Sequence, residues 1–169
     1  MKTLIVIPSR YASTRFPQKP LHEIAGQSLL SRVVEIARIC AEQAGNVSYV
    51  VATDHETIEA HAKQLGAPVV MTDPDLPSGT DRALAAANIA APDADFVVNL
   101  QGDAPFTPPD YISAIIKAGG ATALDAVTPI VQMSWAALDE VREQKKQTPF
   151  SGTSCIVNGD DEALWFFGL

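Results

Sequence analysis

The sequence predicts an α/β fold, namely a Rossmann-like, doubly wound and mostly parallel sheet with helices on both faces. Two observations support this prediction. Short apolar runs typical of buried strands alternate with segments whose apolar residues recur at helical spacing, and such alternation is typical of parallel sheets with helical crossovers. With 169 residues, 47% of them hydrophobic, the chain is also long enough for one compact domain over residues 1–169.

The elements are predicted from their patterns in order. Thr3–Ile7 is an apolar run and the first strand, and Leu29–Glu42 has helical spacing with Ser28 as its N-cap. Val47–Thr53 is the second strand, and Asp54 is expected to cap the next helix. The later elements are a helix over Glu56–Leu65, a strand over Pro68–Met71, a helix from Ser78 to about Ile89, a strand over Asp95–Leu100, a helix from Pro108 to Lys117, a strand over Ala126–Gln132, a helix that Ser134 caps and that reaches about Gln144, and strands over Cys155–Asn158 and Leu164–Phe167. We expect Trp135, Trp165, Phe166 and Phe167 to belong to the core rather than to a stacking platform.

Composition and charge exclude several classes of protein. The formal net charge of -8 argues against nucleic-acid binding, which requires a basic face. No apolar run approaches the roughly 18 residues of a membrane span, and the first apolar run is too short for a signal peptide. Cys40 and Cys155 lie far apart without metal-ligand spacing, so we expect free, buried thiols. These features predict a cytoplasmic protein without membrane insertion.

The segment from Pro8 to Leu21 is the most informative part of the chain. It follows the first strand and carries Arg10, Arg15 and Lys19, and no acidic residue occurs before Glu23. Arginine binds phosphate oxygens through two parallel hydrogen bonds, and lysine supplies a mobile charge. Cations at the carboxyl end of a parallel strand suit a polyanion, so the segment predicts a nucleoside triphosphate site.

Three further motifs lie where strands and helices meet. Asp103 in Gln101-Gly102-Asp103 follows an apolar strand, and its carboxylate suits Mg²⁺, which prefers oxygen ligands and substrate phosphates. Ser78-Gly79-Thr80-Asp81-Arg82 opens a helix, where free N–H groups suit the base or ribose of a nucleotide. A helix N-cap explains Ser78 as an alternative. Ala52-Thr53-Asp54 ends a strand, and either nucleotide contact or a helix cap explains it.

In their order along the chain, these four motifs resemble those of the 3-deoxy-manno-octulosonate cytidylyltransferase (CMP-Kdo synthetase) family, over about the first 105 residues. The resemblance implies transfer of CMP from CTP to a Kdo-like acid sugar with release of pyrophosphate, Mg²⁺ as cofactor, a part in lipopolysaccharide biosynthesis and a possible homodimer. It implies catalytic roles for Arg10, Lys19 and Asp103, with Asp103 as the metal ligand. The nucleotide-binding residues that it implies are Pro8, Ser9, Arg10, Arg15, Lys19, Thr53, Asp54, Ser78, Gly79, Arg82 and Gln101.

The chain departs from the family in two respects. Members of the family are longer, so the resemblance implies that a carboxyl-terminal third, which supplies much of the acid-sugar pocket, is missing. The family usually has glutamate after the motif aspartate, where this chain has Ala104. The alternative to an active transferase is therefore a catalytically impaired nucleotide-binding remnant or an interaction protein of the same fold.

Overall fold

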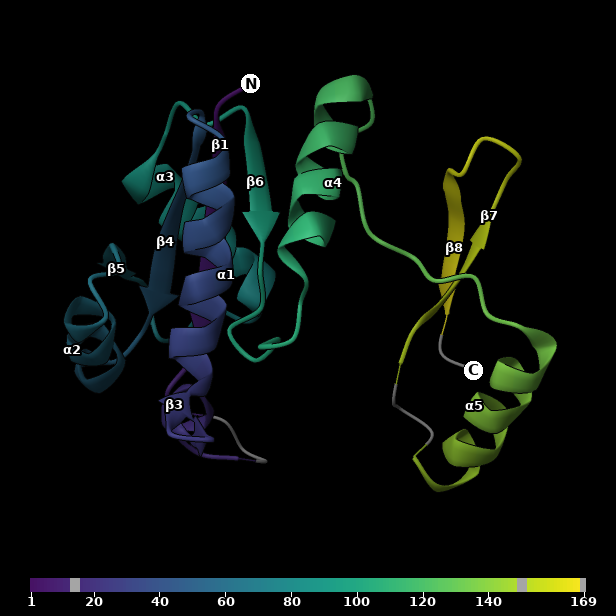
Figure 1. The fold of residues 1–169 in the computed structure, drawn as a ribbon, viewed down its shortest axis with the longest axis horizontal. Coiled ribbons are helices and arrows are strands. Elements are labelled where there is room, and N and C mark those ends of the chain that lie inside the picture. Colours follow the sequence, from purple (N-terminus) through teal and green to yellow (C-terminus); the bar gives the residue numbers. More distant parts are fainter. Residues whose placement is uncertain (13–15, 149–151, 168–169) are drawn as a thin grey trace. The chain divides into compact units, whose positions relative to one another are not determined.

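A computed structural model of the chain describes residues 1–12, 16–148 and 152–167. The chain divides into two compact units, Met1–Val127 and Thr128–Leu169 (Figure 1). The single domain expected over residues 1–169 stays a prediction. Among the described helices, none combines the length and apolar character needed to cross a membrane.

The first unit is built on a four-stranded parallel sheet. Its strands are β1 (Thr3–Ser9), β4 (Val47–Thr53), β5 (Val69–Met71) and β6 (Phe96–Asn99), in the order β5-β4-β1-β6. The chain runs outward from β1 through β4 to β5 and then returns to the other side of β1 as β6. The strand order therefore reverses between β1 and β6, which confirms the expected doubly wound α/β fold.

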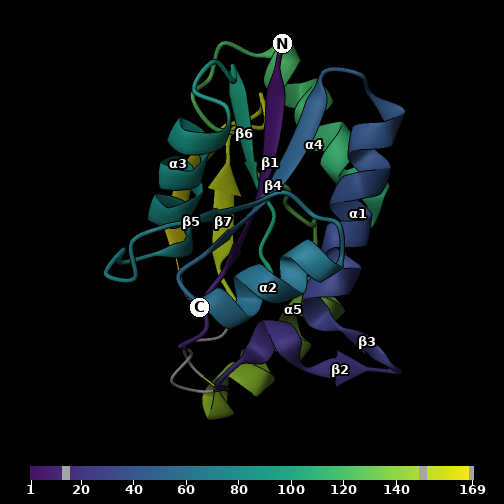
Figure 2. The same ribbon diagram turned by 90° about the vertical axis from the view of Figure 1, so that its left-hand side faces the viewer.

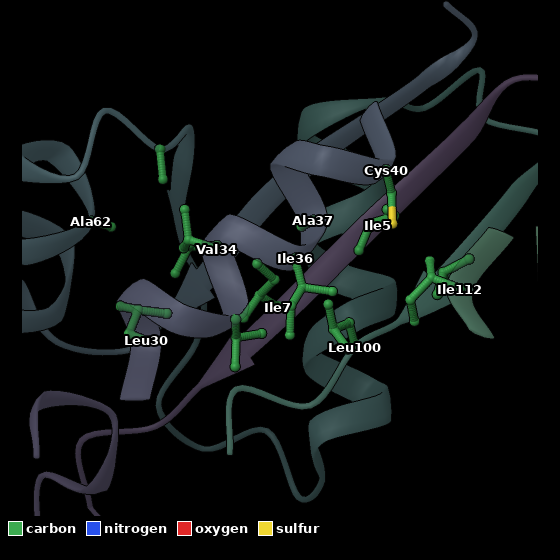
Figure 3. Packing of buried hydrophobic residues seen from close by; sticks show 14 of the residues in the cluster. Ile5, Ile7, Leu30, Val34, Ile36, Ala37, Cys40, Ala62, Leu100 and Ile112 are labelled. Atoms are coloured by element: carbon green, nitrogen blue, oxygen red, sulfur yellow. The ribbon is translucent and has the colours of Figure 1, made fainter. Parts of the chain in front are cut away.

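Helices cover both faces of this sheet. They are α1 (Leu29–Gln43), α2 (Glu56–Gln64), α3 (Gly79–Ala90) and α4 (Pro109–Ala121). Side chains from α1, α2 and α4 share one buried cluster with Ile5 and Ile7 of β1, and Figure 3 shows part of this packing. The other face packs Leu4 and Val6 of β1 against alanines of α3 (Figure 2). Burial on both faces explains why β1 is a continuous apolar run.

Small elements connect β1 to α1. They are the 3₁₀ helix η1 (Lys19–Leu21) and a short antiparallel hairpin of β2 (Glu23–Ile24) and β3 (Gln27–Ser28). The hairpin was not predicted from the sequence. Its turn needs left-handed backbone at Ala25 (φ 51°) and Gly26 (φ 76°). Ser28 caps α1, as predicted, by accepting a hydrogen bond from the N–H of Ser31 (3.0 Å).

The second unit contains α5 (Trp135–Gln147) and an antiparallel pair of strands, β7 (Ser154–Val157) and β8 (Ala163–Phe167). Ser134 caps α5, as predicted. The strand predicted over residues 126–132 is wrong, since this segment is neither strand nor helix. The core positions predicted for Trp135, Trp165 and Phe166 are also wrong, because these side chains are exposed. The prediction for the Phe167 side chain lies outside what the structure describes.

Candidate functional site

The site predicted from the sequence lies at the carboxyl ends of β1 and β6. Ser9 at the end of β1 is in register with Thr53 at the end of β4. The chain after β6 continues alongside β1, where the N–H of Leu100 bonds the carbonyl of Val6 (2.9 Å) and the N–H of Gly102 bonds that of Pro8 (3.3 Å). In open α/β sheets, ligands bind outside these strand ends at the point where the strand order reverses.

The segment after β1 presents two of its three predicted cations at this edge. Arg10 is half-buried, and its Nη2 donates to the carbonyl of Leu76 (3.3 Å) in the loop before α3. Lys19 begins η1. Arg15 lies outside the described residues. Tyr11 and Gln18 close the segment through a backbone hydrogen bond (3.1 Å) and a bond from Gln18 Nε2 to the Tyr11 hydroxyl (2.7 Å).

Lys19 and Asp103 form an ion pair across the edge. Nζ of Lys19 lies 2.6 Å from Oδ2 of Asp103, and the side chains are 38% and 50% exposed. Both charged groups are therefore open to solvent and to a ligand. The pair joins the segment after β1 to the turn after β6.

Two glycines allow the chain segments at this edge to approach one another closely. A Cβ atom at Gly102 would lie 2.5 Å from Oγ of Ser9 and 2.8 Å from the carbonyl oxygen of Pro8. One at Gly79 would lie 3.3 Å from Oε1 of Gln101. Gln101 donates through Nε2 to Oδ1 of Asn99 (2.9 Å). Pro8, Ser9, Gly79 and Gln101 are therefore brought together between β1, β6 and α3.

Ser78 caps the helix that borders the site. Its hydroxyl oxygen accepts a hydrogen bond from the N–H of Asp81 (3.1 Å), and the hydroxyl also donates to the carboxylate of Asp81. The N-cap explanation of Ser78 is thus confirmed. Its predicted contact with a nucleotide stays a prediction.

Asp54 and Arg82 form a buried ion pair beneath the edge. Nη2 of Arg82 lies 3.0 Å from Oδ2 of Asp54, and the side chains are 0% and 9% exposed. Burial has the largest effect on Arg82 and lowers the pKa of its guanidinium; Asp54 opposes this, and the positive charge of Arg10 adds to it. Nη1 of Arg82 also bonds the hydroxyl of Thr72. Thr53, also predicted to bind nucleotide, is fully buried.

The predicted cap of α2 is wrong. The N-cap residue is His55, whose Nδ1 accepts from the N–H of Thr57 (3.1 Å), while Asp54 is held by Arg82. The His55 ring also stacks on Tyr11, with centroids 3.6 Å apart and planes 9° from parallel. Sequence reasoning missed this stack and the Arg82 pair. Both join residues far apart in the chain, and no local pattern signals them.

The donor set restricts the kind of metal that the site can hold. No group of three or more His, Cys, Asp or Glu side chains with metal-binding geometry occurs in the part of the chain that the structure describes. Mg²⁺ is commonly held by one or two carboxylates together with water and substrate phosphates. An exposed Asp103 next to a cationic segment fits an ion of this kind, whereas a structural zinc cage does not fit.

Comparisons with known proteins show which family the chain resembles. A profile of the cytidylyltransferase family matches residues 4–146. The 3-deoxy-manno-octulosonate cytidylyltransferase of Maricaulis maris (strain MCS10) is 41% identical over 167 residues, covering 98% of this chain and 63% of that protein. The enzyme of the same name from Rickettsia massiliae (strain Mtu5) is 36% identical over 173 residues, covering 98% of this chain and 69% of that protein.

Solved structures show the same similarity. CMP:2-keto-3-deoxy-manno-octonic acid synthetase, complexed with CTP, matches with a TM-score of 0.76 and 31% identity, covering 98% of this chain and 64% of that one. A cytidylyltransferase from Leptospira borgpetersenii serovar Hardjo-bovis (strain JB197) matches with a TM-score of 0.59 and 28% identity, covering 73% of this chain and 50% of that one.

The chain thus spans less than two thirds of the length of several of the relatives that it matches from end to end. The family resemblance predicted from the four motifs is confirmed by the profile match over residues 4–146 and by the 36% sequence identity to the Rickettsia massiliae enzyme. The chain belongs to the cytidylyltransferase family.

Proposed function

We propose that the protein transfers CMP from CTP to a hydroxyl group of a Kdo-like acid sugar and releases pyrophosphate. The observation that carries this proposal is the Lys19–Asp103 pair, which puts a cation and a potential metal ligand together where the strand order reverses. The names of the relatives, and a similar structure complexed with CTP, support the choice of nucleotide and acceptor.

Arg10 and Lys19 would bind the triphosphate. Arginine can donate two parallel hydrogen bonds to phosphate oxygens. The flexible lysine side chain can keep its ammonium near the phosphate group on which negative charge develops. During the reaction, the acceptor oxygen bonds to the α-phosphorus, and the bond from that phosphorus to the bridging oxygen breaks. Negative charge then accumulates on pyrophosphate, and cations placed in advance stabilise it. No covalent enzyme intermediate is needed, because the fold has only to position the reactants.

We infer that the reaction uses a divalent cation, specifically Mg²⁺, with Asp103 as its protein ligand. The chemistry that Mg²⁺ supplies when bound is neutralisation of phosphate charge and orientation of the phosphate oxygens. Asp103 alone makes a weak site, so we expect metal binding to depend on the nucleotide. The carboxylate of Asp103 accepts a hydrogen bond from the ammonium of Lys19, which holds it at this edge of the sheet.

The base and ribose would lie against the residues between β1, β6 and α3. Pro8, Ser9, Gly79 and Gln101 meet there, and Ser78 caps the first turn of α3 beside them. The free N–H groups of this turn and the amide of Gln101 can bond a base edge or ribose hydroxyls. Arg15 is assigned to the triphosphate only by its place in the motif.

A coupled assay tests the proposed reaction. The chain is incubated with CTP, Mg²⁺ and Kdo, and released pyrophosphate is measured with inorganic pyrophosphatase and phosphate detection. We expect release that depends on Kdo and is lost in Asp103→Ala. N-acetylneuraminate, a different acid sugar, serves as the matched acceptor control. Binding of CTP without release would contradict the transferase activity and favour a nucleotide-binding remnant.

We also propose that two copies of the chain associate. The exposed side chains of Trp135, Trp165 and Phe166 in the second unit support this, because large exposed apolar side chains mark association surfaces. Light scattering after size exclusion measures the mass directly. A mass near the 18.0 kDa of one chain at micromolar concentration would contradict association.

A further inference from the structure

Among the residues that the structure describes, Arg82 is the largest fully buried side chain, and it lies in the first turn of α3 beneath the proposed CTP site. Its guanidinium contacts the ends of two strands: Nη2 donates to Asp54, which follows β4, and Nη1 donates to Thr72, which follows β5. Among the described residues its Nε–H has no hydrogen-bond partner. A side chain with no exposed surface cannot touch a nucleotide that binds outside the strand ends.

Asp54 connects Arg82 to the segment that carries Arg10. One carboxylate oxygen accepts from Arg82 (3.0 Å), and the other accepts from the backbone N–H of Tyr11 (3.1 Å). Tyr11 is the next residue after Arg10. The backbone at the base of the cationic segment is therefore bonded to an anion whose own position is set by Arg82.

Stability alone does not account for this pair. Withdrawing two charges from water costs free energy that their attraction only partly returns, and buried ion pairs can often be replaced by apolar residues without loss of stability. The pair does, however, fix direction, because a guanidinium bonded at Asp54 and Thr72 holds the carboxylate in one orientation.

We propose that Arg82 is a positioning residue of the nucleotide site: through Asp54 it holds the backbone at Tyr11 and so sets the place from which Arg10 reaches the triphosphate. This inference rests on the proposed CTP site. It assigns to Arg82 an indirect role, distinct from the direct nucleotide contact implied by its motif.

A double-mutant cycle tests the role. Arg82→Lys keeps the charge but lacks the planar fork that bonds Asp54 and Thr72 together. Residues that act through one another couple strongly, whereas independent residues give additive effects. We expect Arg82→Lys to weaken CTP–Mg²⁺ binding about tenfold when Arg10 is present, and less than about twofold in an Arg10→Ala background.

The matched control is Arg38→Lys on the exposed face of α1, which should change the affinity less than about twofold in both backgrounds. Equal losses from Arg82→Lys in both backgrounds would overturn the proposal.

A second measurement does not need the nucleotide. We expect hydrogen exchange at the Tyr11 amide, measured by NMR, to be at least about tenfold faster in Arg82→Lys than in Arg38→Lys. The reason is that the carboxylate of Asp54, which accepts from this amide, is no longer held in place by the guanidinium. Retained protection of Tyr11 would overturn the positioning role whatever the chain binds. Failure of the unaltered chain to bind CTP would instead overturn the proposed function.

A further variant covers the case in which Arg82→Lys does not fold. Replacing both partners, as Arg82→Met with Asp54→Asn, avoids leaving one buried charge alone and keeps an oxygen that can face Tyr11. We expect this variant to fold, to lose Tyr11 protection and to bind CTP–Mg²⁺ about tenfold more weakly. Unchanged protection and affinity in this variant would contradict the role of Arg82.

Discussion

The ammonium of Lys19 lies 2.6 Å from the carboxylate of Asp103, although 84 positions separate the two residues in the chain. One follows β1 and the other follows β6, so the pair spans the point where the strand order reverses. An ion pair this exposed contributes only about 0–1 kcal/mol. A triphosphate or a metal ion can therefore take over either charge at little cost in stability.

The first prediction concerns this pair. Lys19→Ala and Asp103→Ala should each weaken CTP–Mg²⁺ binding by about tenfold or more, because each removes a hydrogen bond or ligand to a charged group. Calorimetric titration measures the affinity. The thermal midpoint should hardly change, since the pair is exposed. Lys63→Ala, which removes a surface pair with Glu59 on α2, is the matched control and should bind as the parent does. Parental affinity in both site variants would refute the assignment.

Close packing at Gly102 gives the second prediction. Gly102→Ala should lower the free energy of unfolding by about 1–3 kcal/mol, because the new methyl group would meet the backbone of Pro8. It should also weaken CTP binding, since Asp103 is the next residue. Urea unfolding and calorimetry measure the two effects. Gly45→Ala, where the added Cβ has nothing within 4 Å, should have neither. If Gly102→Ala changes neither the free energy of unfolding nor the CTP affinity, the close approach of Gly102 to Pro8 is not required.

The third prediction separates capping from ligand binding at Ser78. Ser78→Ala should cost about 1 kcal/mol of stability, as loss of an N-cap does, and should also weaken CTP binding. Ser28→Ala removes the equivalent cap of α1 in the same unit. It should reduce stability at least as much without changing CTP affinity. If both variants keep the parental affinity, Ser78 is a cap and nothing more.

The two cysteines should react at different rates, which is the fourth prediction. Both thiols are free, as predicted, but only Cys40 is buried; the burial predicted for Cys155 is wrong, because its side chain is partly exposed. Burial, aided by Asp110, raises the pKa of the Cys40 thiol, so less of it is reactive thiolate at a given pH. Labelling with a thiol reagent at pH 8 should modify Cys155 rapidly and Cys40 only upon unfolding. A fast phase that survives in Cys155→Ser would contradict this.

The same shift determines a pH dependence. Because the thiol pKa is higher in the folded chain, the unfolded chain ionises first as the pH rises past the ordinary value. The contribution of Cys40 to stability should therefore be constant at neutral pH and fall only under alkaline conditions. Comparing Cys40→Ala with the parent in urea at neutral and alkaline pH would show whether the difference changes in this direction.

The parts of the fold that could be predicted from sequence are those that local patterns specify. The strand over Val47–Thr53 was predicted with its observed bounds. The observed strand β1 extends two residues beyond the predicted strand Thr3–Ile7. Serine caps at Ser28, Ser78 and Ser134 were read from residue type and position. In each case the signal and the structure involve neighbouring residues.

The errors occurred where distant residues decide the structure. The run over 126–132 has the apolar character of a strand, but a strand also needs a partner, and this segment forms no ladder. Asp54 is a good cap by residue type, yet Arg82, 28 positions away, holds it instead. Trp135 and Trp165 are apolar enough for a core, but their local unit does not bury them.

The candidate site could be located but not assembled from sequence. Arg10, Lys19 and Asp103 were placed at the carboxyl ends of their strands, which follows from the alternation of strands and helices. That Lys19 and Asp103 bond directly, and that Asp54 connects Arg82 to Tyr11, depends on how the loops pack. No periodicity in the chain carries that information.

The most direct test of the central claim is a calorimetric titration of the chain with CTP, ATP, GTP and UTP, each with Mg²⁺. We expect CTP to bind with a single site per chain and at least about tenfold more tightly than the other three. Binding of CTP that disappears when Mg²⁺ is chelated would further support Asp103 as a ligand shared with the phosphates. Equal affinity for all four nucleotides would contradict the choice of CTP, and no binding of any of them would contradict a nucleotide site between β1 and β6.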